Sequence, residues 1–223
     1  LRVIGGNVTV VQGGTVVLPC TLVDTEDDLD QISWQRMTRG KPQNQNFYTI
    51  LGKNGPQYVN GDDDGRFTFA GSMKEKNGSL QLSRVKLADE GTYTCIFALY
   101  PSGNHKTEIH LNVLVPPVMY LRRNDVTLGT EEVSLVTCTA AGSKPPAAVT
   151  WLTGALANKV RETNSSTQHD NGTRTTVSTL YGVPTREISQ HLVQCVVTSA
   201  ALPKEETLDF TIQVYCRYTN IYL

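Results

Sequence analysis

Apolar residues alternate with polar ones over short stretches along the whole chain. Residues 16–20, 80–82 and 109–113 carry apolar side chains at every second position, and residues 208–214 do the same near the end. A period of two is typical of β-strands that bury one face. Turn-forming pairs such as Asn77-Gly78 and Asn171-Gly172 separate such stretches, and no long helical period is present. The pattern predicts an all-β protein.

Two Cys–Trp–Cys triplets divide the 223 residues into halves. They are Cys20-Trp34-Cys95 and Cys138-Trp151-Cys195. In an immunoglobulin sandwich, one cysteine on each of two facing sheets forms a disulfide bond, and a tryptophan from a third strand packs against it. Tyr93, two positions before Cys95, fits the tyrosine corner of this fold, and Gly91 permits a tight entry into its strand. We therefore predict two tandem immunoglobulin-like β-sandwiches with disulfides Cys20–Cys95 and Cys138–Cys195.

The cysteine spacing also predicts the type of each sandwich. The first pair is 75 positions apart and leaves room for the extra strands of a variable-type domain, whereas 57 positions suit a constant-type domain. Two adjacent prolines, Pro116 and Pro117, lie between the triplets, where they disfavour helix and form a short, stiff joint. We expect a V-type domain over 1–115, a Pro-Pro linker at 116–117, a C-type domain over 118–215 and a tail at 216–223.

Charge and composition exclude several classes of function. The formal net charge is −1, from 20 basic and 21 acidic residues, so nothing indicates nucleic acid as a partner. The acidic runs 26–28 and 62–64 lie among turn formers and are interpreted as solvated loop tips, without the ligand spacing of a calcium loop. No apolar run reaches the roughly 18 residues of a membrane span, so we expect any signal peptide to be already removed and a single-pass anchor to lie outside this sequence.

Four Asn-x-Ser/Thr sequons favour the secretory route and an extracellular location. They are Asn7, Asn77, Asn164 and Asn171. Asn7 precedes the strands of the first sheet, and Asn77 lies near the start of the strand at 80–82. We expect both to lie away from the sheet that strands G, F, C and C′ form in the immunoglobulin nomenclature, and this glycan-poor face is the leading candidate for binding a partner.

Three motifs give the chain a resemblance to the nectin and poliovirus-receptor family. They are Gln31-Ile32-Ser33-Trp34, the stretch Asp89-Glu90-Gly91-Thr92-Tyr93-Thr94-Cys95, and Leu99-Tyr100-Pro101-Ser102-Gly103. The last is similar to the family's Thr-(Phe/Tyr)-Pro-x-Gly loop, with Leu99 in place of the threonine. Lys53-Asn54-Gly55 loosely matches a glycine-containing turn of the family, and Leu114-Val115-Pro116-Pro117 its interdomain joint. The resemblance implies a cell-surface adhesion glycoprotein or immune ligand, of a family that includes virus receptors.

The resemblance further implies face-to-face docking, homophilic or with a relative or lymphocyte receptor, and a weak homodimer through the first domain. Tyr100 of one molecule would enter a pocket near strands C and C′ of the other. Independently of the family, an aromatic side chain beside Pro101 and Gly103 lies on a preorganised loop and loses little entropy on binding. Alternation predicts that further contacts face outward, because Trp34 and Cys95 face inward. The predicted partner-binding residues are Tyr100, Pro101, Gly103, Leu99, Gln31, Ser33, Gln35, Phe47, Tyr48, Ile96 and Ala98.

Other classes of function fit the sequence less well. The four histidines lie apart, outside any catalytic motif, so we expect no enzyme activity and no cofactor or metal. A sialic-acid-type lectin would need an arginine on the strand from Thr92 to Leu99, which has none. For Phe47, packing under the sheet edge is an equal alternative to partner binding. Cys216 is left over from the two pairs, which indicates either an intermolecular disulfide or an unusual terminus.

Overall fold

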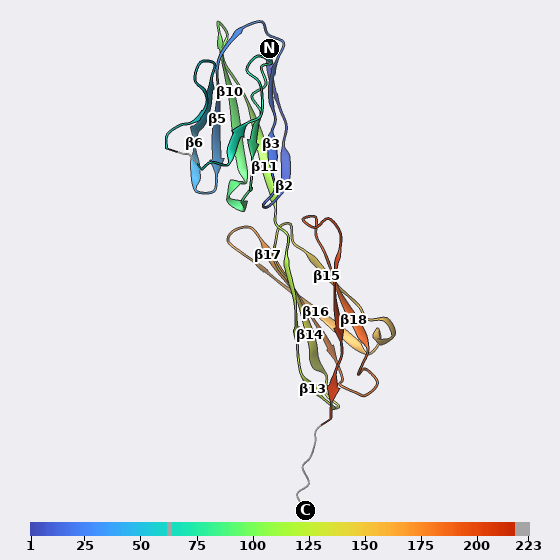
Figure 1. Cartoon of the computed structure of the whole chain (residues 1–223). Coiled ribbons are helices and arrows are strands. Elements are labelled where there is room, and N and C mark those ends of the chain that lie inside the picture. The colour runs from blue at the N-terminus through green and yellow to red at the C-terminus, as the bar shows by residue number, and fades with distance from the viewer. Residues whose placement is uncertain (62–63, 217–223) are drawn as a thin grey trace, which may run out of the picture. The chain divides into compact units, whose positions relative to one another are not determined.

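The computed structural model describes residues 1–61 and 64–216. The chain forms two compact units, Leu1–Leu114 and the part from Val115 onward. Strands dominate both, and the predicted all-β fold with a V-type followed by a C-type domain is confirmed (Figure 1). None of the helices in the described part of the chain is long and apolar enough to cross a membrane.

The first unit contains a six-stranded sheet that includes the additional strands of a variable-type domain. Its order is β2 (Val8–Val11), β11 (Gly103–Leu114), β10 (Gly91–Tyr100), β5 (Asp28–Thr38), β6 (Lys41–Leu51) and β7 (Gly55–Tyr58). β2 runs parallel to β11, and the other neighbours are antiparallel. The long central strands β5 and β10 lie side by side in Figure 1.

The opposite layer of the first unit is built from shorter strands. It comprises β3 (Val16–Leu18), β9 (Leu80–Leu82) and β8 (Phe67–Phe69), with β1 (Arg2–Gly5) paired to β4 (Cys20–Val23) and the short 3-10 helix η1 (Leu87–Asp89) before β10. The disulfide Cys20–Cys95 joins β4 to β10 through the core, as predicted. Trp34 is fully buried beside it, and its Nε1 donates a hydrogen bond to the carbonyl of Gly78 at 2.9 Å.

The chain changes sheets between β1 and β2. Gly5 and Gly6 make this crossing, and a Cβ on Gly5 would lie 2.9 Å from Cγ2 of Thr107 on β11. A side chain there would force the two strands apart, so only glycine allows β1 to approach β11 this closely. The crossing places Asn7 immediately before β2, at the edge of the six-stranded sheet.

The tyrosine corner predicted from the sequence is present. The hydroxyl of Tyr93 donates to the backbone carbonyl of Asp89 at 2.8 Å. Burial, followed by the nearby carboxylate of Asp89, raises the pKa of Tyr93 well above its ordinary value, so the phenol remains a donor. Gly91 has φ +155°, and a Cβ there would lie 2.3 Å from the carbonyl oxygen of Met37. The entry into β10 therefore requires glycine, as expected.

A buried ion pair lies beside the first core, next to the start of β10. Arg66 donates to both carboxylate oxygens of Asp89, at 2.5 and 2.7 Å, and both side chains are more than nine-tenths buried. Asp64 joins them, 3.1 Å from Arg66 and 3.6 Å from Arg36. Asp64 is exposed, which agrees with the interpretation of residues 62–64 as a solvated loop, but its carboxylate also pairs with Arg66 two positions later and with the distant Arg36. Asp62 and Asp63 lie outside the described residues.

The second unit has the four-plus-three arrangement of a constant-type domain. One sheet contains β12 (Val118–Arg123), β14 (Val133–Ser143), β17 (Arg174–Gly182) and β16 (Val160–Gln168), and the other contains β15 (Ala148–Leu152), β18 (Leu192–Thr198) and β19 (Glu206–Thr211). β13 (Val126–Thr127) pairs with β20 (Val214–Tyr215), and the 3-10 helix η2 (Gly154–Leu156) follows β15. Cys138–Cys195 bridges the two sheets, and Cys216 is unpaired and exposed.

Candidate docking surface

The six-stranded sheet of the first unit has one face turned away from the core, which we call the outer face. Strand register assigns its members, because residues paired across neighbouring strands point to the same side. Counting from inward-facing Trp34 and Cys95, the outer face contains Thr9, Gln31, Ser33, Gln35, Met37, Asn46, Thr49, Leu51, Thr92, Thr94, Ile96, Ala98, Asn104, Lys106, Glu108, His110 and Asn112.

The centre of the outer face is formed by mostly neutral side chains. Gln31 donates to the hydroxyl of Ser33 at 2.5 Å, and Gln35 donates to Oδ1 of Asn46 at 2.8 Å. These bonds hold the polar side chains down along the sheet. Ile96 and Ala98 lie beside them on β10 and are partly exposed. The outward orientation predicted for Gln31, Ser33, Gln35, Ile96 and Ala98 agrees with the register, although Ser33 is only 6% exposed.

Two further predicted contact residues are not on the surface. Leu99 is 6% exposed and belongs to the core, because it shares the inward parity of Cys95. Tyr48 is 5% exposed, since it pairs with Trp34 and so points the same way, and its ring packs edge-on against Tyr58 with centroids 5.0 Å apart. The prediction that Leu99 and Tyr48 contact a partner is therefore wrong.

Phe47 is also buried, at 1% exposure. The register between β5 and β6 shifts at this point, so that Phe47 is an additional residue between two cross-strand pairs. Such a bulge re-aims the side chain, and two consecutive residues of β6 can then face inward. Phe47 packs against Phe67 at 4.8 Å between ring centroids, and the guanidinium of Arg36 lies 4.6 Å from its ring. Of its two predicted roles, core packing is the correct one.

Tyr100 lies at the tip of the first unit and is 71% exposed, the largest exposure of any large apolar or aromatic side chain in the described part of the chain. It ends β10, directly across from Asp28 at the start of β5. Pro101 and Ser102 form the turn, and Gly103 begins β11 with φ +81°, a conformation that favours glycine. A large ring is therefore presented to solvent on a short, constrained hairpin.

A surface hollow of about 390 Å³ lies at the same end of the sheet. Its lining residues are Leu29, Asp30, Leu51, Gly52, Lys53 and Asn54. They come from the start of β5 and from the turn between β6 and β7, where Gly55 has φ +69°. The hollow falls near the lower end of the roughly 300–1,000 Å³ range of small-ligand sites, which is enough for a single aromatic side chain.

The residues of this hollow were mostly missed by the sequence analysis. The resemblance implied a pocket near strands C and C′, and the Lys53-Asn54-Gly55 turn was one of its motifs, but Phe47 and Tyr48 were the residues predicted to contact a partner in this region. The alternation of side chains along the strands could have identified Leu51, because it pairs with outward-facing Gln31 and so faces outward as well. Asp30 lies at a register shift between β5 and β10, which alternation alone does not predict.

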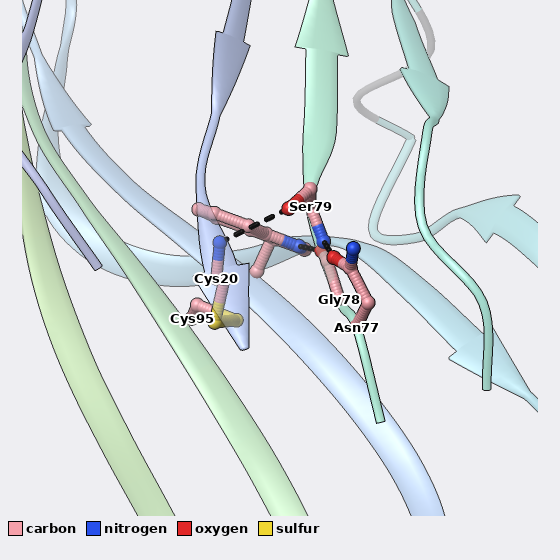
Figure 2. The surroundings of a disulfide bond; sticks show 6 residues. Cys20, Asn77, Gly78, Ser79 and Cys95 are labelled. Atoms are coloured by element: carbon pink, nitrogen blue, oxygen red, sulfur yellow. Dashed lines mark hydrogen bonds between the residues drawn. A yellow bond between two sulfur atoms is a disulfide. The ribbon is translucent and has the colours of Figure 1, made fainter. Parts of the chain in front are cut away.

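The four sequons lie in different surroundings. Asn77 lies on the opposite layer, where its Oδ1 accepts from the backbone N–H of Ser79, while the Ser79 hydroxyl accepts from the N–H of Cys20 (Figure 2). Asn164 and Asn171 are exposed in the second unit. Asn7, however, is not remote from the candidate surface, because its Oδ1 accepts a hydrogen bond from the backbone N–H of His110 on β11 at 3.1 Å. The expectation that Asn7 lies away from this sheet is wrong.

Comparisons with known proteins agree with this architecture. The immunoglobulin V-set domain matches residues 6–114, and the CD80-like C2-set immunoglobulin domain matches residues 117–206. Nectin-2 of Mus musculus is 29% identical over 208 residues, covering 91% of this chain and 38% of that protein. Nectin-4 of Xenopus tropicalis is 28% identical, and the match covers 93% of this chain and 38% of that protein. Nectin-2 of Homo sapiens is 28% identical, and the match covers 91% of this chain and 39% of that protein. The chain thus spans about two fifths of the length of these relatives. With a V-set domain followed by a C2-set domain, the chain is built of two immunoglobulin-superfamily domains, and over most of its length it is similar to nectins.

Proposed function

We propose that this chain is part of the extracellular region of a cell-surface adhesion or recognition protein, which binds a second copy of itself or a related immunoglobulin-superfamily protein through the outer face. As a nectin-like chain it is not an enzyme. The proposal rests on one observation: the exposed ring of Tyr100 and a hollow of suitable size lie at the same end of one sheet.

Tyr100 has the properties of an interface anchor. Aromatic residues dominate interface energies when they enter a desolvated pocket, and truncation of such an anchor often costs 2 kcal/mol or more. The constrained hairpin around Tyr100 reduces the entropy lost on binding. In the free chain Tyr100 is 71% exposed, so the ring is accessible to a partner without any rearrangement of the hairpin.

The hollow offers the complementary surface. Leu29 and Leu51 provide apolar walls, while Asp30, Lys53 and Asn54 provide polar groups near a phenol hydroxyl. Because ring and hollow are on the same chain, a two-fold dimer would contain the ring-in-hollow contact twice, once in each direction. A relative with an equivalent hollow would accept Tyr100 in the same manner.

The outer face suits protein more than carbohydrate. The outward positions of β10 are Thr92, Thr94, Ile96 and Ala98, which include no cation to bind the carboxylate of a sialic acid. Small and neutral side chains allow another sheet to approach closely. We expect weak binding between single molecules, strengthened by avidity when many copies cluster on a cell surface.

Replacing Tyr100 with alanine tests the proposal. The chain, produced with its native glycans, would be measured for self-association by sedimentation velocity and for binding to nectin ectodomains by surface plasmon resonance. We expect Tyr100→Ala to weaken the interaction about 30-fold, the equivalent of 2 kcal/mol. Tyr120→Ala is the matched control, because Tyr120 is 51% exposed on β12 of the second unit. Equal affinities for wild type and Tyr100→Ala would reject the anchor.

A further inference from the structure

We propose that an N-linked oligosaccharide on Asn7 covers the β2 side of the outer face and confines a bound partner to the end that carries Tyr100. This inference rests on the proposed function, since it concerns which part of the docking surface is accessible. It assigns a steric role to a modification site that the fold brings to the sheet edge.

The position of Asn7 follows from the crossing between β1 and β2. Its side chain extends the β2–β11 ladder by one bond, from the backbone N–H of His110 to Oδ1. Asn7 is exposed, so its Nδ2 is accessible to a sugar while Oδ1 keeps this bond. Thr9, which completes the sequon, faces outward opposite Asn112. The first sugar would therefore stand at the edge of the outer face itself.

The neighbours of Asn7 are outer-face residues at the end farthest from Tyr100. His110 pairs with Thr92, and Thr92 pairs with Met37, so these three form one row across β11, β10 and β5. The hydroxyl of Thr92 and Nδ1 of His110 are 3.0 Å apart. Met37 is 47% exposed and is the apolar member of this row.

Strand geometry separates this row from the tip. His110 and Asn104 are six positions apart on β11, which corresponds to about 20 Å along the sheet. Asn104 shares its row with Ala98 and Gln31, next to Tyr100 and the hollow. A bulky, hydrated oligosaccharide at Asn7 would cover the His110 row and leave the tip row open. A partner would then dock with its footprint displaced toward Tyr100.

The first test removes the sugar without disturbing the strand. Thr9→Val destroys the sequon but keeps a β-branched residue, whereas Thr9→Ser keeps the sequon as the matched control. Both would be produced in secretory cells, with occupancy of Asn7 measured by peptide mass spectrometry. We expect Asn7 to be occupied in the wild type, and Thr9→Val to bind about three- to tenfold more tightly, because without the sugar the partner can also contact the His110 row.

The second test maps the footprint with Met37→Glu. In the glycosylated chain this change should leave affinity unchanged, and in the Thr9→Val background it should weaken binding. An unoccupied Asn7, unchanged affinity in Thr9→Val, or a loss caused by Met37→Glu in the glycosylated chain would each overturn the inference. The Tyr100→Ala result separates these outcomes from failure of the docking proposal, because Tyr100 lies at the other end of the surface.

Discussion

Replacing Asp89 with alanine is expected to lower the free energy of unfolding of the first domain by about 3–5 kcal/mol. The substitution leaves the guanidinium of Arg66, which is 8% exposed, without its bidentate partner. Asp64 remains 3.1 Å from the guanidinium but is more exposed, so the buried charge is only partly compensated, and this is far more costly than the net contribution of the intact pair. Asp89 also accepts from the N–H of Lys86 at 2.7 Å, so the turn before β10 loses a bond as well. Chemical denaturation followed by tryptophan fluorescence would measure the change.

An exposed ion pair provides the comparison. Glu132 accepts from Arg161 on the surface of the second unit, and this bond lowers the pKa of the Glu132 carboxyl. Solvent screens such a pair, so Glu132→Ala should leave the denaturation midpoint unchanged within error. If Asp89→Ala were as mild as Glu132→Ala, the ion pair at Arg66 would not be the structural element described above.

Removal of either disulfide should lower the free energy of unfolding of its domain by nearly as much as Asp89→Ala. The bond Cys20–Cys95 closes a loop of 75 residues and Cys138–Cys195 one of 57, and loop-closure entropy predicts about 4 kcal/mol for each. We expect Cys20→Ala/Cys95→Ala to lower the first domain's stability by this amount, which is a large share of the 5–15 kcal/mol typical of a domain. Differential scanning calorimetry with and without reductant would measure it.

Cys216 supplies the control for this experiment. It is exposed and unpaired, so Cys216→Ser should leave both thermal transitions in place. Non-reducing electrophoresis of the same samples would also show whether Cys216 links two chains. A thermal midpoint of Cys20→Ala/Cys95→Ala equal to that of wild type would contradict the structural role of the bond.

The fold was predictable because its signals are local and repeated. Each Cys–Trp–Cys triplet combines a covalent requirement with a packing requirement, and Tyr93 and Gly91 add a hydrogen bond and a backbone conformation at fixed offsets from Cys95. Parity from Trp34 then gave the correct orientation for the outer positions of β5 and β10. These inferences depend only on the alternation of side chains within a strand and on the fixed geometry of the disulfide, the tryptophan and the tyrosine corner.

The errors came from features that a period of two does not contain. Alternation did not decide between partner binding and core packing for Phe47, because the bulge in β6 interrupts the period of two. Asn7 was placed away from the sheet because the crossing at Gly5 depends on the contact with Thr107, a hundred positions later. The ion pair between Asp64 and Arg36 was not predicted, because only tertiary folding brings these two residues together.

The central claim is that the outer face of the six-stranded sheet binds a protein, and Ile96→Glu tests it most directly. Ile96 lies between Ser33 and Lys106 at the centre of this face, so an interface there would bury an unpaired carboxylate. Val17→Glu is the matched control, since Val17 is 43% exposed on β3 of the opposite layer. Measured by sedimentation velocity and surface plasmon resonance, Ile96→Glu should abolish self-association or nectin binding while Val17→Glu retains it. Retained binding in Ile96→Glu, or equal loss in both variants, would contradict the account.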